Sequence, residues 1–427
     1  MFEYDDGRVA VRTRPPGRLS EKEIHLLREL AHRVADIGSH PVQAQRIAFH
    51  RRHNALEGER PALLCFPEGA WEELVPMASM TCRDPFWQGY ECYLRRLLYR
   101  WAHIPDDFVT EPALGVPLCA DLTGWGAAPR RAALDMPGSS WRYEPVLTEL
   151  HQWRSLLKPI DLTVDEAVTS RAFQAVGEVL GDILPVYVDR SFCEANPLLL
   201  ETLCGLRGME NLYYDLVDEE EEVHAILSFL QDSWLALYDR IEASTIFTSN
   251  TGNHYIGSGG IGFCNMPAHD PAHPLKGMWG FCEAQELANV SPAMYHDFAT
   301  TYYRPLLERF GLGCVGCCEN LDGKLVDLAE SLPNLRRVSV SPWTNLPRAR
   351  KEIGGRVILS WKPSPSLVAG FSYDPESVER YLADNLSPCC GVPLEIILKD
   401  TQTVHGEGER LTKFLQNART AVERYCQ

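Results

Sequence analysis

The repeating order of elements in the second half of the chain constrains its fold most. From about residue 165 onward, helical segments alternate with short apolar runs that are typical of strands. The expected strands cover residues 183–188, 253–256, 278–284, 313–317, 337–340, 356–360 and 394–398. Strands separated by helices pair in parallel, because each helix carries the chain back across the sheet. About seven such strands favour a closed (β/α)8 TIM barrel within the α/β class, and an open doubly wound sheet is the alternative.

The first part of the chain follows a different pattern. Ser20 and Glu23 form a capping box ahead of an apolar period, which predicts a helix. The segment Pro105–Tyr143 is rich in Pro, Gly and Trp and has no clear period, so it predicts an irregular or antiparallel elaboration. We therefore expect an N-terminal helical and irregular extension over residues 1–150, packed on a barrel formed by residues 151–427.

Charge and cysteine content exclude several classes of function. The chain has 58 acidic and 41 basic side chains and a formal net charge of -17, which repels nucleic acid and anionic membranes. No apolar run approaches the roughly 18 residues that span a bilayer, and the polar start has no signal-peptide core. The 14 cysteines are mostly scattered, as in a reducing compartment. These features predict a soluble cytoplasmic protein that binds neither nucleic acid nor membrane.

The most distinctive motif is a group of thiols at the end of an expected strand. Cys314, Cys317 and Cys318 occur within five residues, followed by Glu319. Thiolates on a tight turn are suitable ligands for Zn²⁺. Adjacent cysteines cannot both face inward from a regular strand, so we expect a turn to begin near them. The alternative is that these cysteines are small buried hydrophobic residues.

Carboxylates follow two other expected strands. Glu283 and Glu286 lie just after one strand and before a helix, and Asp400 follows the last strand together with Lys399. Barrel enzymes place their chemistry at the carboxyl ends of the strands. Carboxylates there serve as metal ligands or as acid and base groups with raised pKa values. A solvated loop around Glu283 and Glu286 is the competing interpretation.

A glycine-rich segment follows the strand expected at residues 253–256. Residues Gly257-Ser258-Gly259-Gly260-Ile-Gly262 match the G-x-G-x-x-G pattern. A dinucleotide-binding fingerprint also needs a helix to begin there, but the next segment contains three prolines and no helical period. The pattern favours backbone amides that approach a bulky ligand closely, rather than nucleotide binding.

Taken together and in this order, the motifs resemble the uroporphyrinogen decarboxylase-like superfamily. The similarity is greatest to its branch of corrinoid-dependent methyltransferase-type barrels with a Gly-Cys-Cys-Glu motif. It runs from about Pro185 to Arg424, and more faintly from Arg51. The segments that carry it are 206–211, 257–260, 279–286, 291–295, 316–319, 339–343, 362–363 and 398–401.

The resemblance implies a barrel in which zinc activates a thiol or polarises a methyl donor beside a corrinoid, here expected on a partner protein. Related methyltransferases carry His-x-Cys where this chain has Gly316-Cys317-Cys318, so the ligand set departs from the family pattern. We expect the following roles: Cys317, Cys318 and His405 as metal ligands; Glu283, Glu286 and Asp400 as catalytic residues; and Gly257, Ser258, Gly259 and Gly260 at a cofactor.

The leading functional hypothesis is methyl transfer between a small methylated compound or thiol and a corrinoid. One alternative is a metal-independent decarboxylase or lyase that uses Lys399, Asp400 and Glu286. A porphyrinogen substrate is disfavoured because the N-terminal part has no convincing arginine-rich motif for substrate carboxylates. The other alternative is a non-catalytic barrel that carries a corrinoid or tetrapyrrole. The sequence leaves a homodimer open.

Overall fold

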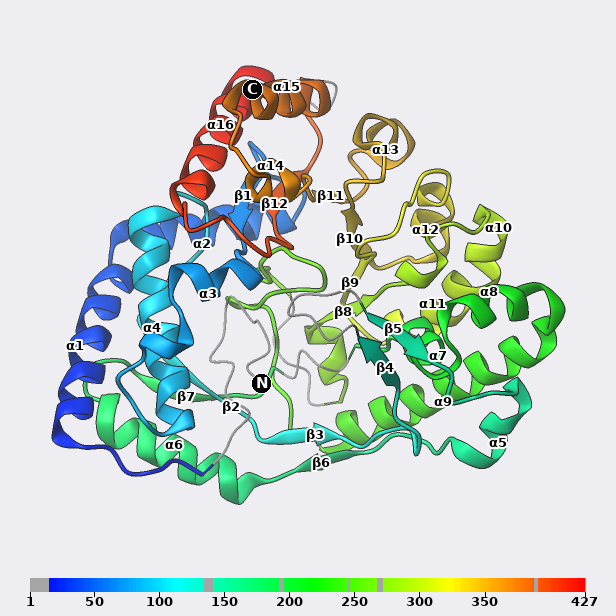
Figure 1. The fold of residues 1–427 in the computed structure, drawn as a ribbon, viewed down its shortest axis with the longest axis horizontal. Helices are drawn as coiled ribbons and strands as arrows, with labels where there is room; N and C mark the ends of the chain where they lie inside the picture. The colour runs from blue at the N-terminus through cyan, green and yellow to red at the C-terminus, as the bar shows by residue number, and fades with distance from the viewer. Residues whose placement is uncertain are drawn as a thin grey trace.

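The protein has a mixed α/β fold built around one parallel sheet (Figure 1). The structure is a computed structural model and describes residues 15–133, 141–191, 196–244, 246–266, 272–387 and 391–426. The six-stranded sheet has the order β1-β12-β11-β10-β9-β8. Its strands are β1 (Ala62–Cys65), β8 (Trp279–Cys282), β9 (Leu312–Val315), β10 (Leu335–Val340), β11 (Ile358–Trp361) and β12 (Leu394–Leu398).

These strands are buried on both faces. All residues of β1, β8, β11 and β12 are buried, as expected for a parallel sheet covered by helices. Helices α11 (Thr301–Leu307), α12 (Leu325–Ser331), α13 (Leu346–Ile353), α15 (Pro375–Leu386) and α16 (Glu409–Tyr425) lie outside the curved row of strands (Figure 1). The remaining helices in the described residues are α1 (Glu21–Gly38), α2 (Pro41–Asn54), α3 (Trp71–Leu74), α4 (Pro85–His103), α5 (Trp153–Leu156), α6 (Glu166–Leu180), α7 (Leu199–Arg207), α8 (Met209–Asp218), α9 (Glu220–Ser244), α10 (Pro292–Tyr295) and α14 (Ser366–Ala369).

Side chains, rather than further strands, bond the two edges of this sheet. At the β1 edge, Asp107 accepts a hydrogen bond from Leu63 N at 2.9 Å, and its own N–H donates to Leu63 O at 2.8 Å. At the β8 edge, the Asn250 amide donates to Trp279 O at 3.0 Å and accepts from Trp279 N at 2.7 Å. The hydrogen bonds among the described strands therefore form a six-stranded sheet and do not close the expected eight-stranded barrel.

Three smaller strand pairs accompany the main sheet. β2 (Leu114–Pro117) and β7 (Val186–Asp189) pair in parallel. β3 (Ala120–Leu122) pairs with β6 (Leu162–Val164), and β4 (Arg130–Ala133) with β5 (Trp141–Glu144), both antiparallel. β3, β4 and most of β5 lie in the segment that the sequence predicts as an irregular or antiparallel elaboration, whereas β6 follows it. In contrast, β1 lies within residues 1–150 and pairs with β12. This part of the chain therefore contributes a strand to the main sheet as well as packing on it.

The strand expected at residues 253–256 is not present, so that prediction was wrong. Only one antiparallel bridge, between Tyr255 and Ile261, occurs there. Gly257, Gly259 and Gly260 all have positive φ, at 60°, 128° and 93°, and turn the chain back on itself. The segment therefore pairs with its own continuation instead of with a neighbouring strand.

A buried ionic cluster lies inside the sheet. Arg337 on β10 and Glu395 on β12 are 0% and 1% exposed, and Arg337 Nη2 donates to Glu395 Oε1 at 2.9 Å. Arg337 Nη2 also donates to Asn54 Oδ1 at 2.8 Å, and Ser360 Oγ donates to Glu395 Oε2 at 2.6 Å. Burial acts to raise the pKa of Glu395, but Arg337, His53 and Ser360 lower it overall. Glu395 is therefore a paired, ionised carboxylate at neutral pH.

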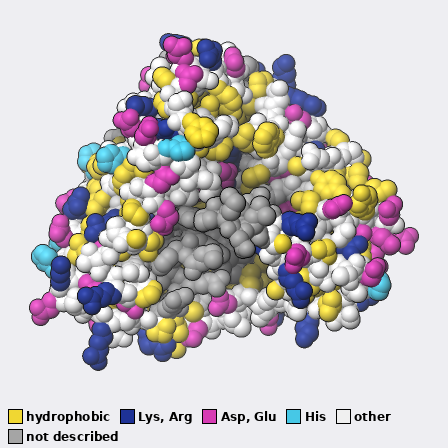
Figure 2. Space-filling model, in the orientation of Figure 1, with side chains coloured by type: hydrophobic (Ala, Val, Ile, Leu, Met, Phe, Trp, Pro, Cys, Tyr) yellow, Lys and Arg dark blue, Asp and Glu magenta, His cyan; other side chains and the backbone are white. Residues whose placement is uncertain are grey.

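Charged side chains of both signs are distributed over the visible surface. On the face in Figure 2, acidic and basic side chains are interspersed among apolar ones. Among the helices in the described residues, none is both long and apolar enough to cross a membrane.

Candidate functional site

The Cys317–Cys318 pair lies on a turn directly after β9. Gly316 has a φ of 92°, a conformation that favours glycine, and its N–H donates to Cys282 O at 3.0 Å. The strand therefore ends where the adjacent cysteines require a turn. Their Sγ atoms are 3.5 Å apart; Cys318 is exposed and Cys317 is half-buried. The hydrogen bond from the Cys317 thiol lowers the pKa of Cys318, and the same contact, together with burial, raises the pKa of Cys317.

Glu319 connects this turn to the segment after β8. Its side chain is fully buried and accepts hydrogen bonds from Cys317 N at 2.7 Å and Ala284 N at 3.2 Å. The Tyr295 hydroxyl also donates to Glu319, at 3.2 Å. One carboxylate thus holds the two candidate loops together, which is a positioning role that the sequence pattern alone did not assign.

Glu283 and Glu286 are buried carboxyl groups with unused acceptor atoms. They are 2% and 5% exposed, and neither Glu283 Oε1 nor Glu286 Oε2 has a hydrogen-bond partner. Burial raises the pKa of Glu286 to about 7, and the negative charges of Glu201 and Glu319 add to this effect. Burial, Glu286 and Glu319 raise the pKa of Glu283 well above its usual range. Both groups therefore hold their protons to a higher pH than an ordinary glutamate, and Glu286 is divided between its acid and its base form at neutral pH.

Backbone contacts hold this segment in place. The hydroxyl of Tyr303 donates to Glu283 O at 2.5 Å, and that of Tyr213 donates to Glu286 O at 2.9 Å. The Glu283 side chain accepts from Gln285 N at 2.9 Å. These bonds come from α11, α8 and the loop itself, so the two carboxyl groups are held by the surrounding helices.

A cavity of about 940 Å³ joins Glu286 to Cys318. Its other walls come from α7, α8 and the end of the β4–β5 pair. Arg207 anchors that end, because its guanidinium is paired with Asp215 at 2.6 Å and donates to Leu147 O at 2.9 Å. The lining residues are Arg142, Tyr143, Glu144, Pro145, Glu201, Cys204, Gly208, Met209, Glu210, Asn211, Gln285, Glu286 and Cys318. The volume accommodates a small substrate together with the reacting end of a second molecule.

The residues expected to bind zinc do not assemble into a complete site. His405 is exposed, its Nε2 lies 3.1 Å from Ala369 O, and its ring stacks against Phe371. In the described part of the chain, no three His, Cys, Asp or Glu side chains converge as metal ligands. Cys317 and Cys318 alone supply two sulfur atoms, fewer than the three protein ligands that catalytic zinc usually has. The donor set present does not fit the zinc centre that the resemblance implies.

Asp400 does not line the cavity at Glu286 and is held by Glu68 and Lys399. It has a φ of 58°, its N–H donates to Glu68 Oε2 at 2.8 Å, and its carboxylate pairs with Lys399 at 3.1 Å. Asp400 raises the pKa of Cys318 and Lys399 lowers it, although the bond with Cys317 has the larger effect. Cys318 is therefore influenced by an ion-paired carboxylate, Asp400, and shares its cavity with an unpaired one, Glu286.

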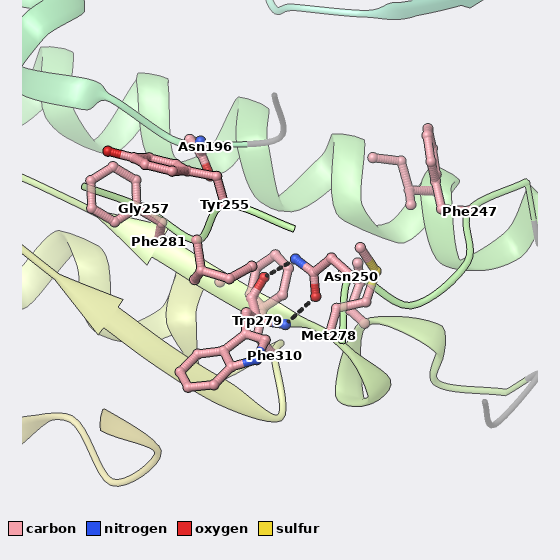
Figure 3. A pocket seen from close by; sticks show the side chains of 13 residues that line it. Asn196, Phe247, Asn250, Tyr255, Gly257, Met278, Trp279, Phe281 and Phe310 are labelled. Carbon is pink, nitrogen blue, oxygen red and sulfur yellow. Dashed lines mark hydrogen bonds between the residues drawn. The ribbon is translucent and has the colours of Figure 1, made fainter. Parts of the chain in front are cut away.

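The glycine-rich loop packs inside the protein, and Gly257 lines a small cavity. A Cβ at Gly260 would lie 2.6 Å from the Arg337 guanidinium carbon, and one at Gly259 would lie 3.0 Å from the Ile397 side chain. Gly257 borders a cavity of about 20 Å³, next to Phe281 and the Asn250 side chain that bonds Trp279 (Figure 3). That volume holds about one water molecule, so the space beside Gly257 is far smaller than the cavity at Glu286.

The sequence indicated only part of the walls of the large cavity, because residues 208–211 belong to a segment that carries the resemblance whereas the rest of α7 and β5 do not. Glu201 lies on α7, and Arg142 and Tyr143 lie on β5, in parts of the chain with no motif. Their shared role depends on how α7 packs against β5, which no local pattern encodes. Only the polar residues after β8 and β9 could be found from their position at strand ends.

Comparisons with known proteins give little further information. No family model matches the chain, and no curated protein matches it. Among solved structures, one similar chain is a methyltransferase from Methanosarcina mazei, with 10% sequence identity and a TM-score of 0.36, covering 72% of this chain and 80% of that one. A TM-score of this size assigns neither a fold nor an activity.

Proposed function

We propose that this protein is a methyltransferase that removes a methyl group from a small compound bound in the Glu286 cavity. The observation that carries the proposal is Glu286 itself, a buried carboxyl group with a free acceptor atom and a pKa of about 7 on the wall of a large cavity. A group that titrates near neutral pH is suited to proton transfer. Removal of a methyl group from oxygen or nitrogen needs such a group, because the departing atom is a poor leaving group until it is protonated.

In the proposed reaction, Glu286 in its acid form protonates the heteroatom that bears the methyl group. The bond from that atom to the methyl carbon then breaks, its electron pair stays on the heteroatom, and the methyl group moves to an acceptor that supplies an electron pair. The resemblance of the motifs makes a reduced corrinoid on a partner protein the expected acceptor. Glu283, whose pKa burial and the neighbouring carboxylates also raise, returns a proton to Glu286 and regains one from solvent.

Zinc has no step in this proposal, because Cys317 and Cys318 do not form a complete ligand set with any third described residue. Cys318 contributes a polarisable sulfur to the cavity wall, where it contacts the bound methyl compound. A decarboxylase or lyase acting on a small acid is less favoured, since the cavity lining has four glutamates and one arginine. Such a lining repels anionic substrates.

The test is methyl transfer from a panel of methylated amines and ethers to reduced cobalamin, followed by visible absorption. We expect Glu286→Gln to lower the rate by about 10²–10⁴-fold, the usual contribution of a general acid. The control is Asp218→Asn, an exposed carboxylate at the end of α8 that does not line the cavity. A Glu286→Gln enzyme as fast as the wild type would contradict the proposal. Tight cobalamin binding without transfer would favour the carrier function instead.

A further inference from the structure

The cavity at Glu286 has an excess of negative charge that no described cation neutralises. Its lining has four glutamates, at positions 144, 201, 210 and 286, and a single cationic side chain, Arg142. Neither Glu201 nor Glu286 forms an ion pair with any residue in the described ranges, and Glu286 Oε2 is buried without a partner. In the sheet, by contrast, the buried carboxylate of Glu395 is paired with the Arg337 cation. The unpaired carboxylates therefore point to a positive charge that comes from a ligand.

Glu201 is close enough to Glu286 to affect it electrostatically. The charge of Glu201 raises the pKa of Glu286, and burial together with the two carboxylates raises the pKa of the Cys204 thiol, which lines the same cavity. Placing two carboxylates in one cavity without a counter-ion costs free energy through repulsion and desolvation. A bound cation would remove that cost, because each carboxylate would gain an opposite charge.

We propose that the cavity binds an organic ammonium compound, with the nitrogen between Glu201 and Glu286. Tyr143 and Met209 line the same cavity and provide aromatic and apolar surface for the carbon groups on the nitrogen. A bare metal ion fits less well, because the described residues contain no group of three or more ligating side chains. An ammonium ion needs fewer direct contacts, since its charge is spread over a larger apolar body.

The inference deepens the proposed function and rests on it where the reaction is concerned. Glu286 gives its proton to a methylated amine in the cavity. The amine becomes an ammonium ion, which pairs with the Glu286 carboxylate that remains. When the carbon–nitrogen bond breaks, its electron pair stays on nitrogen, which keeps the proton and becomes a neutral amine. The methyl group joins the electron pair of the acceptor. The neutral product has lost its charge attraction to Glu201 and Glu286, which favours its release.

Isothermal titration calorimetry of the full-length protein with trimethylamine hydrochloride tests binding separately from activity. The matched neutral probe is tert-butanol, which has nearly the same size and shape. We expect trimethylammonium to bind and tert-butanol to bind at least about tenfold more weakly, as for one well-formed charge interaction. Glu201→Gln and Glu286→Gln should each weaken trimethylammonium binding by about tenfold. Asp218→Asn should leave it unchanged.

Equal affinities for the two probes, no detectable binding of trimethylammonium, or wild-type affinity in both glutamine variants would overturn the inference. Glu201 is only half-buried, so its variant is expected to fold even if Glu286→Gln does not. The proposed function fails separately. Ammonium binding that depends on Glu201, with no methyl loss to reduced cobalamin, supports this inference and contradicts methyl transfer. Methyl loss from ethers without any preference for amines supports methyl transfer and contradicts this inference.

Discussion

Two groups of buried glutamates differ in their partners, and the difference separates structure from function. Glu395 lies within the sheet, where Arg337, Ser360 and His53 lower its pKa below the usual value. Glu283 and Glu286 lie at the carboxyl ends of the strands, where burial and neighbouring carboxylates raise theirs. All three are at most 5% exposed. Burial alone therefore does not mark a functional carboxylate in this protein; Glu283 and Glu286 differ from Glu395 because each lacks a described cationic partner and has one carboxyl oxygen that accepts no hydrogen bond.

The largest expected effect comes from breaking the paired group. Arg337→Met removes the cation from Glu395 and leaves a buried charge without its partner, so we expect the free energy of unfolding to fall by about 3–5 kcal/mol. Urea unfolding at pH 7 measures this change. The control is Arg304→Met, which removes an exposed pair with Glu308 and should cost less than about 1 kcal/mol. Similar losses in the two variants would mean that the Arg337–Glu395 pair is not desolvated.

An intermediate effect should distinguish the two groups by the sign of their pH dependence. The folded-state pKa of Glu286 is raised from 4.5 to about 7, so the folded state binds more protons and stability falls as pH rises through this window. Glu286→Gln removes this pH dependence. The free energy of unfolding of the variant minus that of the wild type should therefore increase by about 2–3 kcal/mol between pH 4.5 and pH 8.

Glu395→Gln provides the opposite case in the same chain. The folded-state pKa of Glu395 is lowered, so its contribution to stability is present above the unfolded pKa of about 4.5 and is lost as pH falls. This variant should be less stable than the wild type at pH 7, and the deficit should shrink in acid. Urea unfolding between pH 4 and pH 8 gives both profiles, and the same sign for the two variants would contradict the comparison.

The smallest effect concerns thiol reactivity and leaves stability unchanged. Cys318 is exposed and its pKa is lowered by the bond with Cys317, whereas burial raises the pKa of Cys314 to about 11. We expect iodoacetamide to modify Cys318 at least about a hundredfold faster than Cys314 near neutral pH, because the thiolate is the reactive form. Peptide mass spectrometry follows both sites. Equal rates in the folded protein would show that Cys318 is not open to the cavity.

Short-range patterns predicted many of the individual elements. The capping box at Ser20 and Glu23 is present, with the Glu23 carboxylate accepting from Ser20 N at 2.7 Å. The run Leu394–Leu398 is the expected strand, and the turn expected at the adjacent cysteines begins at Gly316. Each of these predictions depends on a few consecutive residues, so the sequence contains all the necessary information.

Short-range patterns did not predict what bonds the two outer edges of the sheet. Asp107 and Asn250 bond the outer edges of β1 and β8, although Asn250 is 29 residues from its partner in the chain and Asp107 is 44 residues from its own. A pattern of seven apolar runs predicts parallel strands, but it does not reveal whether a further strand or a side chain bonds the last one. The expected barrel and the observed six-stranded sheet differ for this reason.

For the candidate site, local patterns in the sequence were enough to show that Glu283, Glu286, Cys317 and Cys318 follow neighbouring strands and lie at their carboxyl ends. Tertiary structure decided their chemistry. It placed Glu319 between the two loops, moved His405 away from the thiols, and brought Glu201 next to Glu286 without a cation. The pKa of a carboxyl group depends on the charges and the solvent within a few ångströms, and in a folded chain those neighbours are distant in sequence.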